Sequence, residues 1–209
     1  MNNSKMRTES YGQLSEFSIV DRLGIYLSEQ MVKKYFRSLK KPDIVMLDLG
    51  CGYHARLLKR LAPLVSFGYG VDVAVCQEAK AINNLKIYEG SIENSFSKFN
   101  DSFFDFILMI SVLEHTNDPF FVLSQCRRIL KNEGILLINV PTWRGKFFLE
   151  ASAFKFKLSP ELEVDDHKMY YDLRDLWPLI VKAGFRPGMI KMKYYKFGLN
   201  LFAACKNKI

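Results

Sequence analysis

The stretch VMLDLGCGYHARLLKRL, from Val45 to Leu61, decides the fold. Its apolar beginning is typical of a strand buried on both faces of a parallel sheet. Gly50 and Gly52 predict a tight turn, and the residues from Ala55 onward predict a helix. Gly50, Gly52 and Ala55 match the dinucleotide-binding pattern G-x-G-x-x-A. Asp48 and the two glycines also match D-x-G-x-G, so the rest of the chain has to decide the ligand.

Strands and helices alternate after this stretch. Besides the first strand over residues 44–49, apolar runs predict strands over 67–73, 85–90, 103–110 and 134–141. Helical spacing predicts helices over 55–64, 76–82 and 118–130. This alternation predicts an α/β fold with a Rossmann-like, doubly wound and mostly parallel sheet. A helix over 173–185 and two strands, 189–195 and 199–206, predict an antiparallel C-terminal hairpin around Gly198.

The chain is expected to have two parts. Residues 1–41 are predicted to be a helical N-terminal lead-in or lid, because apolar residues recur at helical spacing from Leu14 to Leu39. Its first 12 or so residues look unordered. Residues 42–209 form the ligand-binding domain. Within it, residues 142–170 mix aromatic and basic side chains without a strong period, which predicts an insertion over the carboxyl edge of the sheet.

Composition limits the classes of protein that fit. The 209 residues carry a net charge of +8, but the basic residues are scattered, so a solvated surface and a patch for an anionic partner both remain open. The four cysteines form no C-x-x-C pair and the three histidines add no metal spacing, so no metal site is expected. Free thiols and a polar N-terminus indicate a cytoplasmic protein. The longest apolar run, 103–113, is too short to span a bilayer, which leaves peripheral membrane contact open.

Six segments carry a family resemblance. In chain order they are LDLGCG, GVDVA, EGSIENSF, FDFILMISVLEHTNDP, RRILKNEGILLINVP and HKMYYDLRDLWPLIVKAGF. Together they resemble the motifs of class I S-adenosylmethionine-dependent methyltransferases over about residues 43–206, and the last two resemble the small-molecule, ubiquinone-type branch. The terminal hairpin is similar to the reversed last strand of that family.

The resemblance implies S-adenosylmethionine as the cofactor. A dinucleotide enzyme would need a second mononucleotide half or a substrate domain, whereas here the chain ends soon after five strands and a hairpin. The acid at Asp72 suits either ligand, because both carry a ribose. The residues that the resemblance implies for cofactor binding are Asp48, Gly50, Cys51, Gly52, Asp72, Val73, Ser91, Ile92 and Ser111.

Particular roles follow from the resemblance. Asp48 is expected to orient the loop and face the amino group of the cofactor, and Asp72 to accept the ribose hydroxyls. Ser91 stands where the family often has an acid at the adenine, and Ile92 is expected to pack on the adenine face. Each of these loop positions also has a plain packing or capping interpretation. His54 stands where the family commonly has a third glycine, a departure that affects the packing of the loop.

Methyl transfer is an in-line displacement, so much of the catalysis can come from positioning the acceptor. A base is needed only where the attacking atom carries a proton of high pKa. His115 and His167 are the candidate bases, and each also has a structural interpretation beside a helix. The segments LEHTNDP and INVP favour a small or lipid-linked acceptor, which we expect to be methylated at oxygen. The aromatic and basic insertion would suit an acceptor with an apolar and an anionic part, such as a sugar on a lipid carrier or a nucleotide-linked sugar, and its other interpretation is a hydrophobic lid. The alternatives are an RNA or protein methyltransferase, which the charge would suit, and a non-catalytic binding protein. The chain is expected to be a monomer or a homodimer.

Overall fold

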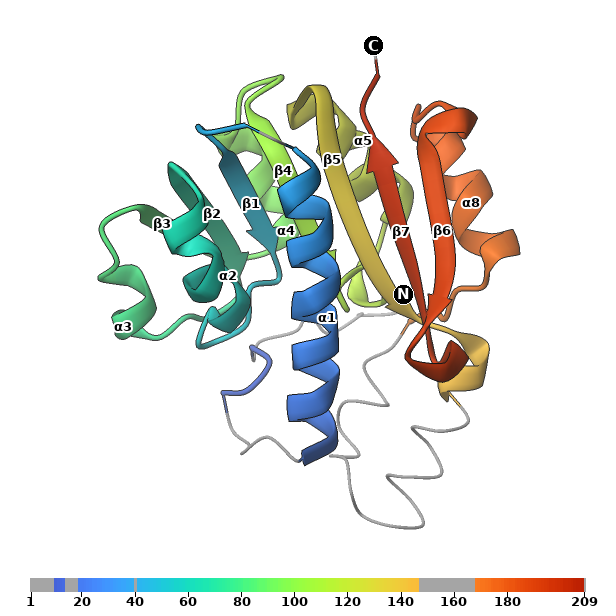
Figure 1. Ribbon diagram of the computed structural model, residues 1–209, viewed down its shortest axis with the longest axis horizontal. Helices are drawn as coiled ribbons and strands as arrows, with labels where there is room; N and C mark the ends of the chain where they lie inside the picture. Colours follow the sequence, from blue (N-terminus) through green and yellow to red (C-terminus); the bar gives the residue numbers. More distant parts are fainter. Residues whose placement is uncertain (1–9, 14–18, 40, 147–167, 209) are drawn as a thin grey trace, which may run out of the picture.

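The computed structural model describes residues 10–13, 19–39, 41–146 and 168–208 (Figure 1). The sheet in this part of the chain has the strand order β3-β2-β1-β4-β5-β7-β6. Its strands are β1 (Val45–Leu49), β2 (Phe67–Asp72), β3 (Leu85–Glu89), β4 (Phe104–Ile110), β5 (Leu130–Pro141), β6 (Ile190–Tyr195) and β7 (Asn200–Lys206). The first five strands pair in parallel, and β7 lies antiparallel between β5 and β6. The predicted fold class, with its reversed C-terminal strand, is confirmed.

Helices cover both faces of the sheet, as the doubly wound prediction requires. They are α1 (Ile19–Ser38), α2 (Arg56–Leu61), α3 (Gln77–Lys80), α4 (Ile92–Ser95), α5 (Pro119–Ile129) and α8 (Leu173–Lys182). Single 3-10 turns follow several of the elements: η1 (Ala62–Leu64), η2 (Phe96–Lys98), η3 (Leu113–His115), η4 (Pro187–Met189) and η5 (Lys196–Gly198). Figure 1 shows α1 in front of the sheet and α5 and α8 behind it. No helix among the described residues is long and apolar enough to cross a membrane.

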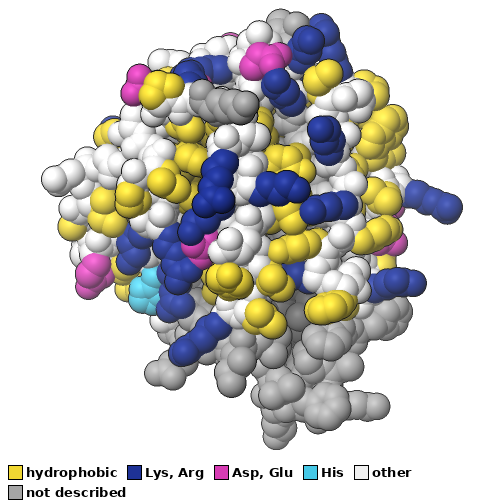
Figure 2. All heavy atoms as spheres, in the orientation of Figure 1, with side chains coloured by type: hydrophobic (Ala, Val, Ile, Leu, Met, Phe, Trp, Pro, Cys, Tyr) yellow, Lys and Arg dark blue, Asp and Glu magenta, His cyan; other side chains and the backbone are white. Residues whose placement is uncertain are grey.

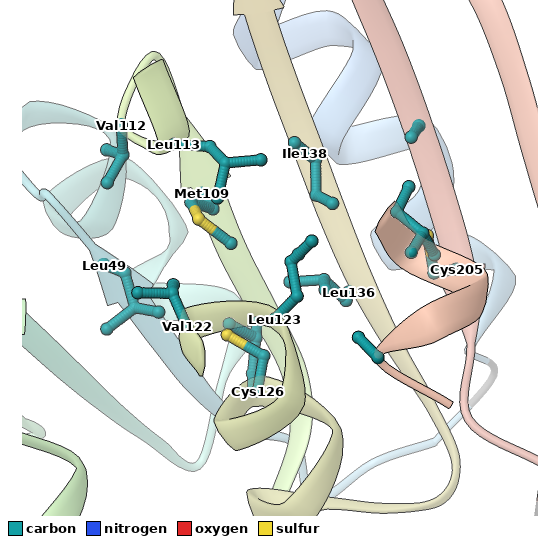
Figure 3. Close-up of a cluster of buried hydrophobic side chains, with 14 of the residues drawn as sticks. Leu49, Met109, Val112, Leu113, Val122, Leu123, Cys126, Leu136, Ile138 and Cys205 are labelled. Carbon is teal, nitrogen blue, oxygen red and sulfur yellow. The ribbon is translucent and has the colours of Figure 1, made fainter. Parts of the chain in front are cut away.

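Two hydrophobic layers hold the sheet between these helices. On one face, Leu49 and Met109 of the strands pack with Val122 and Cys126 of α5 (Figure 3). On the other face, side chains of α1, α2 and α3 pack against alternate residues of the same strands, such as Met46. Successive strand residues therefore face opposite layers, as expected of a sheet covered on both sides.

Helix α1 is joined to the last strands of the sheet, which are far from it in sequence. The hydroxyl of Tyr195 donates a hydrogen bond of 2.6 Å to the carbonyl oxygen of Leu27. The ring of Tyr35 stacks on Phe202 of β7, with ring centroids 5.7 Å apart. The helix predicted over Leu14–Leu39 is thus present from Ile19, and residues 14–18 lie outside the described residues.

Several expected boundaries were wrong by two to four residues, among them the ends of α3 and α8, and for two of them the structure shows the reason. The helix after the glycine turn ends at Leu61 and continues as a 3-10 turn that contains Pro63, since proline cannot donate an intrahelical hydrogen bond. The fifth strand begins at Leu130 instead of Gly134, because the Asn207 amide bonds the Leu130 carbonyl at 2.9 Å and supports an irregular start to the ladder.

The unordered start expected up to about residue 12 was also wrong in part. Residues 10–13 form a turn in which the backbone N–H of Gln13 donates to the carbonyl of Ser10. The side-chain oxygen of Gln13 accepts from the N–H of Ser10 in return. Residues 1–9 lie outside the described residues.

Candidate functional site

The strand order reverses between β1 and β4, and ligands of open α/β sheets bind at the carboxyl ends of the strands at such a point. Gly50, just after β1, lies there against Val112, just after β4. A Cβ on Gly50 would come within 2.3 Å of Cγ2 of Val112, and its φ of 72° lies in the left-handed region. Glycine is therefore required at this position by both contact and conformation.

The carboxylate of Asp72 joins the loops that follow the first two strands. One oxygen accepts a hydrogen bond of 2.7 Å from the N–H of Gly52, and the other accepts one of 2.8 Å from the N–H of Val73. The Asp72 carbonyl also accepts from the N–H of Gly90, which follows β3. Asp72 thus connects the loops after three neighbouring strands at the carboxyl edge.

Asp48 lies on the same face of the sheet, at the end of β1. Its side chain is only 3% exposed. Burial, with the nearby charge of Asp72 adding to it, raises the pKa of Asp48 to about 8. A buried carboxylate without a cation is unfavourable, so this position favours a positively charged ligand group that would offset its charge.

The remaining loop positions contribute mainly their backbone. The N–H groups of Gly50 and Cys51 both donate to the carbonyl of Val71. The Cys51 side chain packs in the layer under α1 and α2, and burial raises the pKa of its thiol far above the usual range. The left-handed residue that precedes α2 is Ala55, with φ of 45°, while the neighbouring His54 ring packs edge-on against Tyr53.

Ser91 and Ile92 follow β3 at the same edge. The Ser91 hydroxyl accepts a hydrogen bond of 3.3 Å from the N–H of Asn94, so it caps the short helix α4. Ile92 packs against the layer on the α5 side. Ser111 follows β4 in a left-handed conformation, with φ of 55°, and its N–H donates to the carbonyl of Asn139.

Of the two candidate bases, the structure describes His115. It ends the 3-10 turn η3 after β4, is partly exposed, and its N–H donates to the carbonyl of Val112. His167 lies outside the described residues. The phenol of Tyr171 is excluded as a base near neutral pH, because burial, aided by the charges of Glu114 and Asp175, raises its pKa to about 12.

Two further residues at this edge were missed from the sequence. The carbonyl of Tyr11 accepts a hydrogen bond of 3.1 Å from the N–H of Tyr53 and lies over Gly52. Nothing local in the sequence signals this contact. Asn139 of β5 is fully buried, and neither amide atom has a hydrogen-bond partner among the residues that the structure describes. A polar residue within the apolar run of β5 was the available signal for Asn139.

An aromatic and basic cluster stands beyond the end of β5. The rings of Trp143 and Tyr170 lie 5.7 Å apart, and the ammonium of Lys146 lies 5.7 Å from the centre of each. These residues belong to the predicted insertion, most of which, residues 147–167, lies outside the described residues. Within the described part of the chain, no group of three or more His, Cys, Asp or Glu side chains is arranged to hold a metal ion.

Comparison with known proteins finds methyltransferases. Residues 47–138, which contain the loops after β1, β2, β3 and β4, match a family model described as a methyltransferase domain. The ubiquinone biosynthesis O-methyltransferase of Dinoroseobacter shibae is 27% identical over 175 residues, which cover 78% of this chain and 69% of that protein.

Solved structures share the fold. A SAM-dependent methyltransferase from Archaeoglobus fulgidus has a TM-score of 0.59 at 16% identity, with 85% of this chain and 94% of that chain covered. The CurJ carbon methyltransferase has a TM-score of 0.65 at 18% identity, with 87% of this chain and 54% of that chain covered. At these identities the likeness concerns the fold alone.

Proposed function

We propose that the chain, an S-adenosylmethionine-dependent methyltransferase with the class I fold, methylates an oxygen of a small acceptor or of one linked to a lipid or sugar. The observation that carries this proposal is the connection of the glycine loop to Asp72 through the 2.7 Å bond from Gly52. Oxygen as the methylated atom is supported by the O-methyltransferase named above.

The residues at the carboxyl edge fit the cofactor. Gly50 and Gly52 both have positive φ, so the backbone after β1 turns sharply at two residues that carry no side chain of their own. Asp72 is held at the strand end, where we assign it to the ribose hydroxyls. Asp48 gives a cationic ligand group a buried counter-charge, and we assign it to the amino group. When bound, S-adenosylmethionine supplies a methyl group already activated by a sulfonium.

The other predicted cofactor contacts remain part of the proposal. Cys51 and Val73 would line the cofactor through their backbone, and Ser111 would lie near the methyl donor after β4. Ser91 and Ile92 would border the adenine. For Ser91 this role competes with the capping bond to Asn94, so we expect its hydroxyl to contribute little affinity.

An oxygen acceptor raises the question of a base. A hydroxyl group of high pKa has to lose its proton as it attacks, and a positioned side chain typically contributes about 10²–10⁴-fold to such a step. His115, after β4, is the described residue that we assign to this role, and His167 is the second candidate. The Trp143, Tyr170 and Lys146 cluster would offer an acceptor both ring surface and positive charge.

The cofactor assignment is tested by calorimetric titration with S-adenosylmethionine, S-adenosylhomocysteine and NADH. The wild type is expected to bind the two adenosyl ligands and to ignore NADH. Asp72→Ala should weaken binding by about tenfold or more, since it removes charge-assisted hydrogen bonds. Asp101→Ala is the matched control, because Asp101 forms an ion pair with Arg128 on the surface, away from the candidate site. Failure of the wild type to bind either adenosyl ligand would refute the proposal.

The acceptor is tested with S-adenosylmethionine labelled in its methyl group. Phenols and sugars, each with and without an isoprenoid chain, would be offered beside amine acceptors and RNA. Label is expected on hydroxyl oxygens, and His115→Gln should lower the rate most at neutral pH. Label found only on nitrogen, or only on RNA, would contradict the assignment of the acceptor while leaving the cofactor assignment intact.

A further inference from the structure

The turn between β6 and β7 holds a fully exposed aromatic ring. Phe197 is 99% exposed. Lys196 and Phe197 have φ values of 49° and 59°, in the left-handed region that residues with a side chain rarely adopt. Strained conformations of this kind persist only where the surrounding structure maintains them, and they are concentrated at functional positions.

The surrounding structure fixes this turn in place. The hydroxyl of the buried Thr142 donates a hydrogen bond of 2.7 Å to the carbonyl of Gly198, and its N–H donates one of 3.0 Å to the carbonyl of Leu199. Gly145 packs so closely that a Cβ there would come within 2.3 Å of the Leu199 oxygen. The end of β5 and the residues after it therefore hold the ring of Phe197 out from the molecule.

The turn lies at the same edge of the sheet as the candidate site. Strand β7 runs antiparallel to both β5 and β6, so β6 ends at the carboxyl edge where β5 also ends. Figure 1 shows the turn η5 at the lower end of the sheet, toward which β5 also runs. The beginning of α1 approaches the same place, because the Lys196 ammonium lies close to Gly24. Leu23 and Tyr26 on that part of α1 are 56% and 53% exposed.

Positive charge surrounds these apolar side chains. Arg22 and Lys193 are exposed, and the guanidinium of Arg144 lies beside Gly198. Lys and Arg side chains are spread among hydrophobic ones over the face that α1 covers (Figure 2). The chain as a whole carries a net charge of +8. A protruding aromatic ring with a basic surround complements a surface that is apolar inside and anionic at its boundary.

We propose that Phe197, together with Leu23 and Tyr26, docks the protein on an anionic lipid bilayer, with Lys193 and Arg144 at the level of the headgroup phosphates. A bilayer suits these groups better than a second copy of the chain does. One aromatic side chain buries about 150–250 Å², against about 1,200–2,000 Å² in a stable protein interface. Docking at this edge would face the candidate site toward the membrane, so a lipid-linked acceptor could enter directly; that last link rests on the proposed function.

The test is co-sedimentation with vesicles of phosphatidylcholine alone and of phosphatidylcholine mixed with phosphatidylglycerol. The wild type is expected to bind the anionic vesicles and to dissociate as salt is raised. Phe197→Asp should reduce the partition coefficient by about tenfold or more, because it removes the burial of one aromatic side chain. Phe197→Trp should keep binding, since tryptophan favours the bilayer interface. Lys193→Glu should also weaken binding.

The control is Leu64→Ala, which truncates a 50% exposed leucine ahead of β2, at the opposite edge of the sheet. It is expected to bind vesicles like the wild type. Titration of each variant with S-adenosylhomocysteine separates a folding or cofactor defect from a docking defect. Equal vesicle binding by the wild type and Phe197→Asp would overturn the proposal. So would a wild type that ignores anionic vesicles, or one in which Phe197→Asp instead abolishes a dimer in solution or the binding of RNA.

Discussion

Gly50 and Val112 are in contact across the point where the strand order reverses, and the contact leaves no room for a Cβ on the glycine. The two residues are 62 positions apart in the chain, yet each follows a strand of the same parallel pair. The conformation of the glycine loop after β1 is therefore coupled to the side chain of Val112, which follows β4.

Gly50→Ala is expected to destabilise the protein through two effects. The left-handed conformation costs a residue with a side chain roughly 1–2 kcal/mol, and the overlap with Val112 adds about 1–3 kcal/mol. In Gly50→Ala/Val112→Ala the overlap disappears and the conformational cost remains. Urea unfolding of the wild type, both single variants and the double variant measures the coupling. We expect the double variant to be more stable, by at least about 1 kcal/mol, than the sum of the two single effects predicts. Additive free energies of unfolding would show that the contact does not restrain the loop.

Asp48→Asn is expected to stabilise the free protein while weakening the binding of S-adenosylmethionine. The pKa of Asp48 is about 8 in the fold, against about 3.9 in an unfolded chain. Between these values the folded state binds the extra proton, so the free energy of unfolding falls as the pH rises, by at most about 1.4 kcal/mol per pH unit. Asparagine removes this contribution.

Thermal unfolding from pH 5 to pH 9 measures the stability, and titration with S-adenosylmethionine over the same range measures binding. The wild type should lose stability relative to Asp48→Asn as the pH rises, and should bind the cofactor more tightly as Asp48 ionises. Parallel pH profiles for the two proteins would contradict this assignment of charge.

Asn139→Leu tests the buried amide at the end of β5. Because neither amide atom has a hydrogen-bond partner in the described part of the chain, leucine should raise the free energy of unfolding by about 1–3 kcal/mol. We expect methyl transfer or cofactor binding to fall at the same time, since polar groups kept at a cost in stability are typical of functional positions.

Asn207→Leu is the matched comparison for this prediction. The Asn207 amide donates to the carbonyls of Leu130 and Lys131, so its loss should destabilise the protein. Denaturant unfolding and turnover would be measured on both variants. If Asn139→Leu destabilises the protein as much as Asn207→Leu, the Asn139 amide forms hydrogen bonds in the free protein. Its proposed role in the site would then be contradicted.

The order of elements and the edge that carries the site could be predicted because they depend on local patterns. Buried parallel strands give continuous apolar runs, and Gly50 and Gly52 mark a turn of positive φ directly after the first of them. Once the strands are parallel, the ends of β1, β2, β3 and β4 must meet at one edge. That rule places the ends of β1, β2 and β4, and with them Asp48, Asp72 and Ser111, at this edge. The choice of these three residues as cofactor contacts came from the family resemblance and stays a prediction.

The features that could not be predicted depend on residues far apart in sequence. The early start of β5 depends on Asn207. The turn at residues 10–13 depends on the hydrogen bond that the N–H of Tyr53 donates to the carbonyl of Tyr11. The exposed position of Phe197 is likewise set by Thr142. Hydrophobic periodicity reports which face of an element is buried, but it carries no information about such single polar contacts.

The bond between Tyr195 and Leu27 also has a consequence for biosynthesis. Its two residues are 168 positions apart, so helix α1 leaves the ribosome long before the strands that it covers. At about 5–20 residues per second, the part of α1 that contacts β6 and β7 stays uncovered for on the order of ten seconds or more after it is made. During that interval the nascent chain exposes a surface that chaperones recognise, and folding on this face ends only when the last strand has been made.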